Sequence, residues 1–269
     1  EMYGDWTDRI EAGEFPTVVP PRPQGVERNV VVSLWDWADP RAYMHDLISA
    51  DKRNPRINAN GPVYGAPEDS ADYMPVLDPG THTASMVPLQ VRDPRTPSTA
   101  SRPPMMPSPY WDDEVIWDSQ SVAHSFAMDT QERVWIAARV RPAETPAFCQ
   151  EGSRHPSAQA FPIARSNRQI QMWDPRTQEM ITVDTCFGTH HLNFSEDDKL
   201  WFTGSGPVVG WFDTKVLDET GDEALAQGWT AQVLDTNGNG RRDAHVEPGE
   251  PMDSTKDTRI ERGFYGVAP

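Results

Sequence analysis

Two stretches of the sequence share one pattern and decide the fold that we expect: HSFAMDTQERVWI at residues 124–136 and HHLNFSEDDKLWF at residues 190–202. In each, a histidine opens a short apolar alternation, a polar turn follows, and a cation precedes an apolar run. The first histidine, His124 in one copy and His190 in the other, lies eleven residues before the tryptophan. A hairpin that recurs along a chain is typical of a β-propeller, in which each blade is one four-stranded sheet. We therefore interpret each stretch as the inner hairpin of a blade.

A second kind of hairpin alternates with the first. Residues 74–87 and residues 171–183 each contain two short apolar runs joined by an Asp-Pro turn, and a shorter copy lies at residues 210–214. The aspartate caps such a turn through its own side chain, and the proline fixes the next φ. These outer hairpins, alternating with the inner ones, predict an all-β protein, a β-propeller with about four blades represented.

The remaining regions predict how the chain is divided. We expect an irregular N-terminal arm at residues 1–28 and the propeller at residues 29–269, with a buried strand at 29–35 and a short helix at 39–49. Residues 263–269 resemble the opening of another inner hairpin, with a tyrosine where the histidine would be, and stop before its tryptophan. We therefore expect the propeller to be incomplete at its C-terminus and to be part of a larger ring.

Charge and composition restrict the partners. The net charge of −17 argues against binding to nucleic acids or anionic lipids. The chain contains no run of 18 apolar residues, so we expect no membrane span. It contains 18 glycines, 26 prolines and ten tryptophans, which agrees with many strands and turns.

The two cysteines, Cys149 and Cys186, are compatible with one disulfide or with two buried thiols. We favour the disulfide and a periplasmic or extracellular location, because the chain otherwise resembles an exported protein. The chain begins at Glu1 and not at a methionine, so we expect that an upstream segment has been removed. The bridge would hold the insertion at residues 139–167 beside His190.

A loop at residues 235–243, DTNGNGRRD, matches the first nine positions of an EF-hand-type calcium loop. The twelfth position departs from the pattern, and no flanking helices are predicted. We therefore expect a calcium loop inserted in a β protein, although an Asn-Gly turn without metal is the alternative. The expected calcium ligands are Asp235, Asn237, Asn239, Arg241 through its carbonyl, Asp243 and Glu247.

The histidines of the inner hairpins are the candidate catalytic residues. His124 and His190 occupy the same position in their copies, and a residue that recurs in each blade often has a structural role. His191 has no histidine counterpart, because Ser125 stands at the matching position. A neutral imidazole facing the central channel can be a general base or a metal ligand. We find no Ser-His-Asp order, no glycine-rich phosphate loop and no CxxCH haem motif.

These patterns resemble a known family. The two inner hairpins resemble the blades of virginiamycin B (streptogramin) lyase-like propellers. The wider pattern is similar to secreted bacterial proteins often labelled carboxypeptidase-regulatory-like. The residues that carry this likeness lie at 27–37, 51–55, 184–191 and 235–240. The resemblance implies further domains upstream and further blades downstream. The lyase uses a histidine base and a divalent cation in the channel, which implies His190 or His191 here.

Two functional hypotheses follow. In the first, the chain is an exported β-propeller module of a larger bacterial protein that binds a substrate or a protein partner and carries a structural calcium loop. Its partners are then the remaining blades or domains of that protein, or another protein. In the alternative, it is a lyase-like enzyme in which a channel histidine abstracts a proton and a second divalent cation stabilises the oxyanion. A lactonase-like calcium propeller would instead place its cation at the channel centre.

Overall fold

The computed structural model describes residues 8–9, 11–14, 21, 24–25, 36–39, 41–101, 117–204, 206–263 and 265–269. Contacts within the chain group Asp36–Pro269 into one compact unit, which contains every strand described below. The expected arm at residues 1–28 lies mostly outside the described residues, and the expected strand at residues 29–35 lies wholly outside them. The boundary between arm and propeller therefore stays a prediction.

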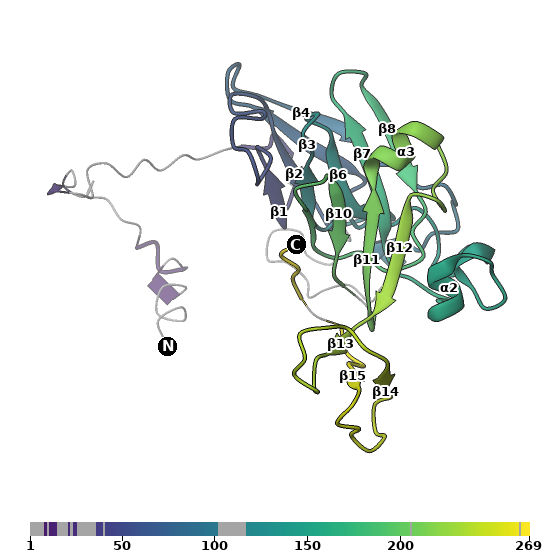
Figure 1. Cartoon of the computed structure of the whole chain (residues 1–269). Coiled ribbons are helices and arrows are strands. Elements are labelled where there is room, and N and C mark those ends of the chain that lie inside the picture. The colour runs from purple at the N-terminus through teal and green to yellow at the C-terminus, as the bar shows by residue number, and fades with distance from the viewer. Residues whose placement is uncertain are drawn as a thin grey trace. The chain divides into compact units, whose positions relative to one another are not determined.

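Three four-stranded antiparallel sheets follow one another along the chain (Figure 1). Blade 1 contains β1 (Asp46–Ile48), β2 (Val63–Ala66), β3 (Tyr73–Asp78) and β4 (Thr83–Pro88). Blade 2 contains β5 (Phe126–Met128), β6 (Val134–Ala138), β7 (Gln169–Asp174) and β8 (Glu179–Val183). Blade 3 contains β9 (Leu192–Phe194), β10 (Lys199–Phe202), β11 (Val208–Asp213) and β12 (Gln227–Ala231). Each sheet is a meander in chain order, as in a propeller blade, so the predicted β-propeller is confirmed with three complete blades described.

A smaller sheet follows blade 3. It contains β13 (Val233–Leu234), β15 (Asp257–Arg259) and β14 (His245–Val246), in that order. β15 pairs with β13 in antiparallel and with β14 in parallel orientation. The long loop between β13 and β14 is the predicted calcium loop.

Helical segments within the described residues are short. Within the described part of Asp36–Pro269 they are η2 (Thr99–Ser101), η3 (Ala147–Cys149), α2 (Pro156–Ala160) and α3 (Thr214–Thr220). The sequence did not indicate α3, which begins where the Asp213 carboxylate accepts hydrogen bonds from two backbone N–H groups and ends at Gly221 in the left-handed region. No helix among the described residues is both long and apolar enough to cross a bilayer.

The helix expected at residues 39–49 is wrong. Asp39 accepts a hydrogen bond from the backbone N–H of Arg41 at 2.8 Å, which closes a local turn, and no helix follows. Residues 46–48 instead form β1, and the backbone N–H of His45 donates to the carbonyl of Ala66 at 2.8 Å. Pairing with β2 therefore overrides the helix-start signal.

The two tryptophans of the repeat are equivalent in the structure. Trp135 lies in β6 and Trp201 in β10, the second strands of their blades. The indole N–H of Trp135 donates to Asp129 at 2.9 Å, and that of Trp201 donates to Ser195 at 3.0 Å. In both cases the acceptor lies six residues earlier in the turn, so the predicted inner hairpins are confirmed.

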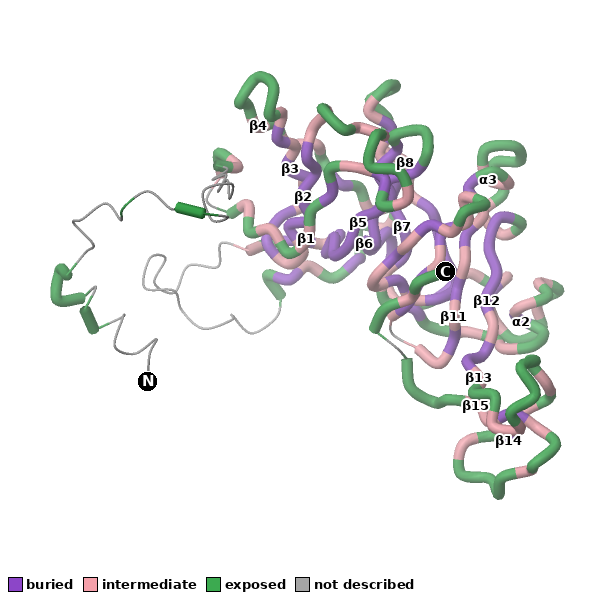
Figure 2. The backbone as a smooth tube through the Cα atoms, turned by 60° about the vertical axis from the view of Figure 1, so that its left-hand side comes forward, coloured by how far each residue is buried: buried purple, intermediate pink, exposed green. Residues whose placement is uncertain are grey.

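Blade 2 is buried on both faces. One hydrophobic cluster lies between blades 1 and 2, and another lies between blades 2 and 3. Every residue of β5 and β6 is buried (Figure 2). Among the described residues, blade 3 packs into a hydrophobic cluster on one face only, and buried and half-buried residues alternate along β10 and β11. Trp135 is accordingly fully buried, whereas Trp201 is half-buried against Trp211.

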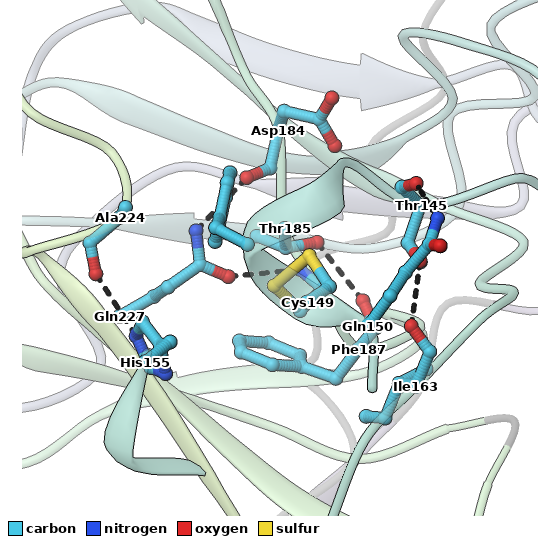
Figure 3. The surroundings of a disulfide bond; sticks show 12 residues. Thr145, Cys149, Gln150, His155, Ile163, Asp184, Thr185, Phe187, Ala224 and Gln227 are labelled. Atoms are coloured by element: carbon cyan, nitrogen blue, oxygen red, sulfur yellow. Dashed lines mark hydrogen bonds between the residues drawn. A yellow bond between two sulfur atoms is a disulfide. The ribbon is translucent and has the colours of Figure 1, made fainter. Parts of the chain in front are cut away.

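A disulfide joins Cys149 and Cys186, as expected, with an S–S distance of 2.01 Å. Both residues are buried in the cluster between blades 2 and 3. The amide side chain of Gln227 accepts from the backbone N–H of Cys186 at 2.8 Å and donates to the carbonyl of Asp184 (Figure 3). The bridge therefore anchors the insertion at residues 139–167 to the strand connection that leads to His190.

Replacement of both cysteines by serine should lower the free energy of unfolding by about 3–4 kcal/mol. The physical reason is that the bridge closes a loop with a sequence separation of 37 residues, which restricts the unfolded chain. Urea denaturation followed by circular dichroism measures the change. The reduced wild-type protein serves as the control and should match the variant. An unchanged midpoint in both samples would contradict this expectation.

Candidate functional site

The inner strands of the three blades lie side by side, and the residues at which they begin lie close together. β5 lies beside β1 on one side and beside β9 on the other. The hydroxyl of Ser125 donates to the Asp46 carboxylate at 3.0 Å, which links blade 2 to blade 1. Each inner strand is preceded by histidine: His45 before β1, His124 before β5, and the pair at residues 190–191 before β9.

These histidine rings lie against one another. The ring centroid of His124 lies 4.1 Å from that of His45, 4.0 Å from that of His190 and 5.3 Å from that of His191. One ring nitrogen from each of His124, His190 and His191 lies within 4.8 Å of the other two. We call these three residues the histidine cluster. The structure therefore brings together all three candidate catalytic residues predicted from the sequence.

Glu68 orients His124. Its carboxylate lies 2.6 Å from Nδ1 of His124 and 3.0 Å from the guanidinium of Arg168. Burial of the Glu68 carboxyl tends to raise its pKa, but the hydrogen bond from His124 and the nearby cations outweigh burial and hold the pKa below its usual value. The ionised carboxylate can only accept, so Nδ1 of His124 donates this hydrogen bond, and Nε2 is the ring nitrogen left for another partner. This is the arrangement that orients histidine ligands in metal sites.

The backbone that carries this pair is strained. Glu68 has φ 43° and Val122 has φ 44°, a conformation that a β-branched residue rarely adopts. The backbone N–H of Glu68 donates to the carbonyl of Ala123 at 2.8 Å, next to His124. Strain of this kind is held by surrounding structure and is concentrated at functional sites.

Two imidazole nitrogens of the cluster are buried without a partner. Nε2 of His124 and Nε2 of His191 have no hydrogen bond within the described part of the chain. Burial and the neighbouring His124 ring lower the pKa of His191, and burial with the rings of His124 and His191 lowers that of His190 to about 4. Both rings are neutral at pH 7, as a metal ligand must be.

His45 offers a second arrangement with the same carboxylate. Its Nδ1 donates to the carbonyl of His124 at 3.2 Å, and its Nε2 lies 3.8 Å from Glu68. His45, Glu68 and His124 form another group with ligand atoms within 4.8 Å of one another. The site can therefore offer up to four imidazoles and one carboxylate.

The C-terminal segment lies against the cluster. The Tyr265 ring centroid is 4.5 Å from that of His191 and 5.3 Å from that of His190. The hydroxyl of Thr203 donates to the carbonyl of Tyr265 at 2.7 Å, and a Cβ at Gly263 would lie 2.6 Å from a backbone oxygen of residue 204. Tyr265 thus lies beside the blade 3 histidines, but residues 265–269 form no strand, so the further inner hairpin stays a prediction.

The predicted calcium loop is compact. The Asp235 carboxylate accepts from the backbone N–H groups of Gly238 at 2.7 Å and Gly240 at 2.8 Å. The side chains of Asn237 and Asn239 both reach Oδ2 of Asp243. The backbone N–H of Arg241 donates to Oδ1 of Asn239 at 2.8 Å, so Arg241 belongs to the loop, where its expected contribution is the backbone carbonyl. Glu247 lies elsewhere, because its carboxylate accepts from Nε of Arg259 at 2.7 Å.

Sequence reasoning missed three residues of the site: His45, Glu68 and Arg168. His45 could have been found by extending the repeat, since a histidine precedes each inner strand. Glu68 and Arg168 carry no such signal, because they lie outside the repeated hairpin and reach the cluster only through the packing of blade 1 on blade 2.

Comparisons with known proteins give a structural likeness. No family model matches the chain, and no curated protein matches it. A structure of streptogramin B lyase is similar, with a TM-score of 0.36, 11% identity and coverage of 65% of this chain and 39% of the lyase. The extracellular domain of a protein described as a hybrid two-component system from B. thetaiotaomicron is also similar, with a TM-score of 0.26, 13% identity and coverage of 78% and 27%.

The expected structural resemblance to streptogramin B lyase is thus confirmed at this level. The likeness is one of fold alone and concerns neither substrate nor activity. The chain spans about two fifths of the length of the lyase, at 39%.

Proposed function

We propose that this chain is an exported β-propeller module that binds a divalent transition-metal ion, and through it a ligand, at the histidine cluster. The observation that carries the proposal is the pair of buried, unpartnered Nε2 atoms of His124 and His191, with His190 at ligand spacing. Imidazole ligands suit Zn²⁺, Fe²⁺, Co²⁺ and Ni²⁺, whereas Mg²⁺ and Ca²⁺ prefer oxygen. One nitrogen from each of the three rings lies within 4.8 Å of the other two, so one ion could be shared among them.

The residues around the cluster fit such an ion. Glu68 fixes the tautomer of His124, and the strained backbone around Ala123 holds both groups in place. Three imidazoles leave coordination positions for a ligand, as in catalytic sites with three protein ligands. A bound ion would supply a Lewis acid for anionic or carbonyl groups, and Tyr265 lies beside the cluster to contact such a ligand.

Titration of the metal-free protein with Co²⁺ tests the proposal. We expect one Co²⁺ per chain, with visible absorption bands typical of nitrogen ligation, and displacement by Zn²⁺ but not by Mg²⁺. Failure of the protein to bind either transition metal at millimolar concentration would refute the proposal. Calorimetry of the same samples gives the stoichiometry independently.

An exported location is part of the proposal. The disulfide between Cys149 and Cys186 supports it, because such bonds persist in oxidising compartments. Mass spectrometry of the protein isolated from periplasmic and culture-medium fractions would locate it. Recovery only as a reduced form from the cytoplasm would contradict the proposal.

We also propose that another sheet, from the same protein or from a partner, covers the open face of blade 3. Trp201 and Trp211 lie on that face with ring centroids 5.6 Å apart, and both are half-buried. The side chain of Asn193 donates to the carbonyl of Val267 at 2.6 Å, so residues 265–269 already run beside β9. Acrylamide quenching of tryptophan fluorescence should fall when that sheet is present, and unchanged quenching would argue against it.

A lyase-like enzyme is the second candidate. The observation in its favour is that His190 stays neutral at pH 7, because burial and the neighbouring rings lower its pKa to about 4. A neutral ring can accept a proton. Conversion of virginiamycin B, measured by chromatography with and without added Zn²⁺ or Mg²⁺, distinguishes the two candidates. If no product forms under either condition, the lyase hypothesis is excluded and the binding module remains as the proposed function.

A further inference from the structure

The small sheet that follows blade 3 has almost no hydrophobic core. Its strands are two or three residues long, too short to be stable alone. Among the described residues from 233 to 262, Val246 is the only apolar side chain that is buried. Leu234, Met252 and Ile260 are exposed, and Figure 2 shows this region mostly as exposed and intermediate. Such a small unit needs another source of stability, and a bound metal ion is a common one.

Asp257 in β15 is the unusual group of this sheet. Its side chain has an exposed fraction of 0%. One carboxylate oxygen, Oδ2, accepts from the backbone N–H of Asp243 at 2.7 Å, so the group points at the end of the calcium-like loop. The other oxygen, Oδ1, is buried and has no hydrogen-bond partner. A buried carboxylate oxygen without a donor is costly, and a cation would remove that cost.

The other oxygen atoms lie in the loop at residues 235–243. Asn237 and Asn239 both direct their side-chain amides at Oδ2 of Asp243. The nitrogen and oxygen of an amide exchange places on a half-turn of the side chain. In the structure the amide oxygens of Asn237 and Asn239 accept from the backbone N–H groups of Asn239 at 3.1 Å and Arg241 at 2.8 Å. A half-turn of both amides would exchange these bonds for two oxygens next to the Asp243 carboxylate. A bound cation would stabilise such a group of oxygens, and Ca²⁺ accepts six to eight of them.

We propose that Ca²⁺ binds between this loop and β15, with Asp257 as the carboxylate that the EF-hand-like pattern lacks at its twelfth position. The other ligands are side-chain oxygens of the loop and the carbonyl of Arg241. Glu247, the residue expected from the sequence, is paired with Arg259 and has a half-exposed side chain. The ion would tie β15 to the connection between β13 and β14. This site is separate from the histidine cluster and uses oxygen ligands only.

Thermal unfolding in 10 mM Ca²⁺ and in EDTA tests the proposal on the full chain. For an affinity on the order of 10⁻⁴ M, Ca²⁺ should raise the unfolding midpoint of the wild type by roughly 5–10 °C. Asp257→Asn should lose most of that increase and weaken Ca²⁺ binding at least tenfold. Glu261→Gln, an exposed carboxylate just after β15, is the matched control and should behave as the wild type.

The EDTA sample separates a ligand from a structural acceptor. If Asp257 is a calcium ligand, Asp257→Asn in EDTA should be at least as stable as the wild type. The amide oxygen can still accept from the backbone N–H of Asp243, and the buried carboxylate oxygen without a donor is removed. If Asp257→Asn lowers the unfolding midpoint equally in EDTA and in Ca²⁺, the proposal is overturned. It is also overturned if Ca²⁺ does not change the unfolding midpoint of the wild type. Asp257→Asn should bind Co²⁺ as tightly as the wild type does. Failure of the calcium proposal can therefore be distinguished from failure of the metal site proposed at the histidine cluster.

Discussion

Replacement of His124 by alanine should weaken Co²⁺ and Zn²⁺ binding roughly 100-fold or more. His124 has the central ring of the cluster, since it lies within 5.3 Å of the rings of His45, His190 and His191. Its Nε2 is buried and unpartnered, its Nδ1 is held by Glu68, and His124 belongs to both groups of candidate ligands. Calorimetric titration of metal-free protein measures the loss.

His82→Ala is the matched control, because His82 lies in the exposed turn between β3 and β4. It should bind metal as the wild type does. Glu68→Gln should give an intermediate loss of about 10–100-fold, because Glu68 positions His124 and does not itself need to bind the ion. A folded His124→Ala protein with wild-type affinity would place the metal elsewhere, and His191→Ala repeats the test if His124→Ala fails to fold.

Replacement of Asp129 by alanine should lower the free energy of unfolding by about 3–5 kcal/mol. The Asp129 carboxylate is 2% exposed and lies in the turn of the blade 2 inner hairpin. It accepts from the backbone N–H of Arg133 at 3.0 Å, from the Arg133 guanidinium at 2.6 Å and from the Trp135 indole at 2.9 Å. Its removal leaves a buried guanidinium with Asp218 as its remaining carboxylate partner among the described contacts.

Ser195→Ala is the matched control for Asp129→Ala. Ser195 accepts from the Trp201 indole at 3.0 Å at the equivalent position of blade 3, but there the tryptophan is half-buried and the pair carries no charge. We expect a loss of about 1 kcal/mol. Urea denaturation followed by circular dichroism compares the two variants. If both variants lower the free energy of unfolding equally, the charge and burial of Asp129 add no stability to the blade 2 turn.

Much of the fold could be predicted because its signals are local. The hairpins at residues 124–136 and 190–202 combine strand periodicity, turn residues and a tryptophan at one spacing, and the structure repeats them with equivalent hydrogen bonds. The outer hairpin turns follow from Asp78 and Asp174, each of which accepts from a backbone N–H two residues later. Blade 1 was harder, because β1 is only three residues long and follows a helix-like start signal.

The candidate site could be predicted only in part. The histidines of blades 2 and 3 belong to the repeat, so their positions were visible, but their contact depends on how the blades pack. Glu68 reaches His124 across 56 positions of sequence, and Asp257 reaches the loop from a strand with no motif of its own. Such pairings arise from tertiary structure, and a single sequence contains no local pattern for them.

The complete burial of β5 and β6 has a consequence for folding. Blade 2 forms its hydrogen bonds locally, yet both of its faces are covered by neighbours that lie before and after it in the chain. A fragment that ends between blades would leave a wide apolar sheet in water and invite aggregation through that surface. The three blades should therefore melt as one cooperative block, and shortened versions of the protein should keep all of them.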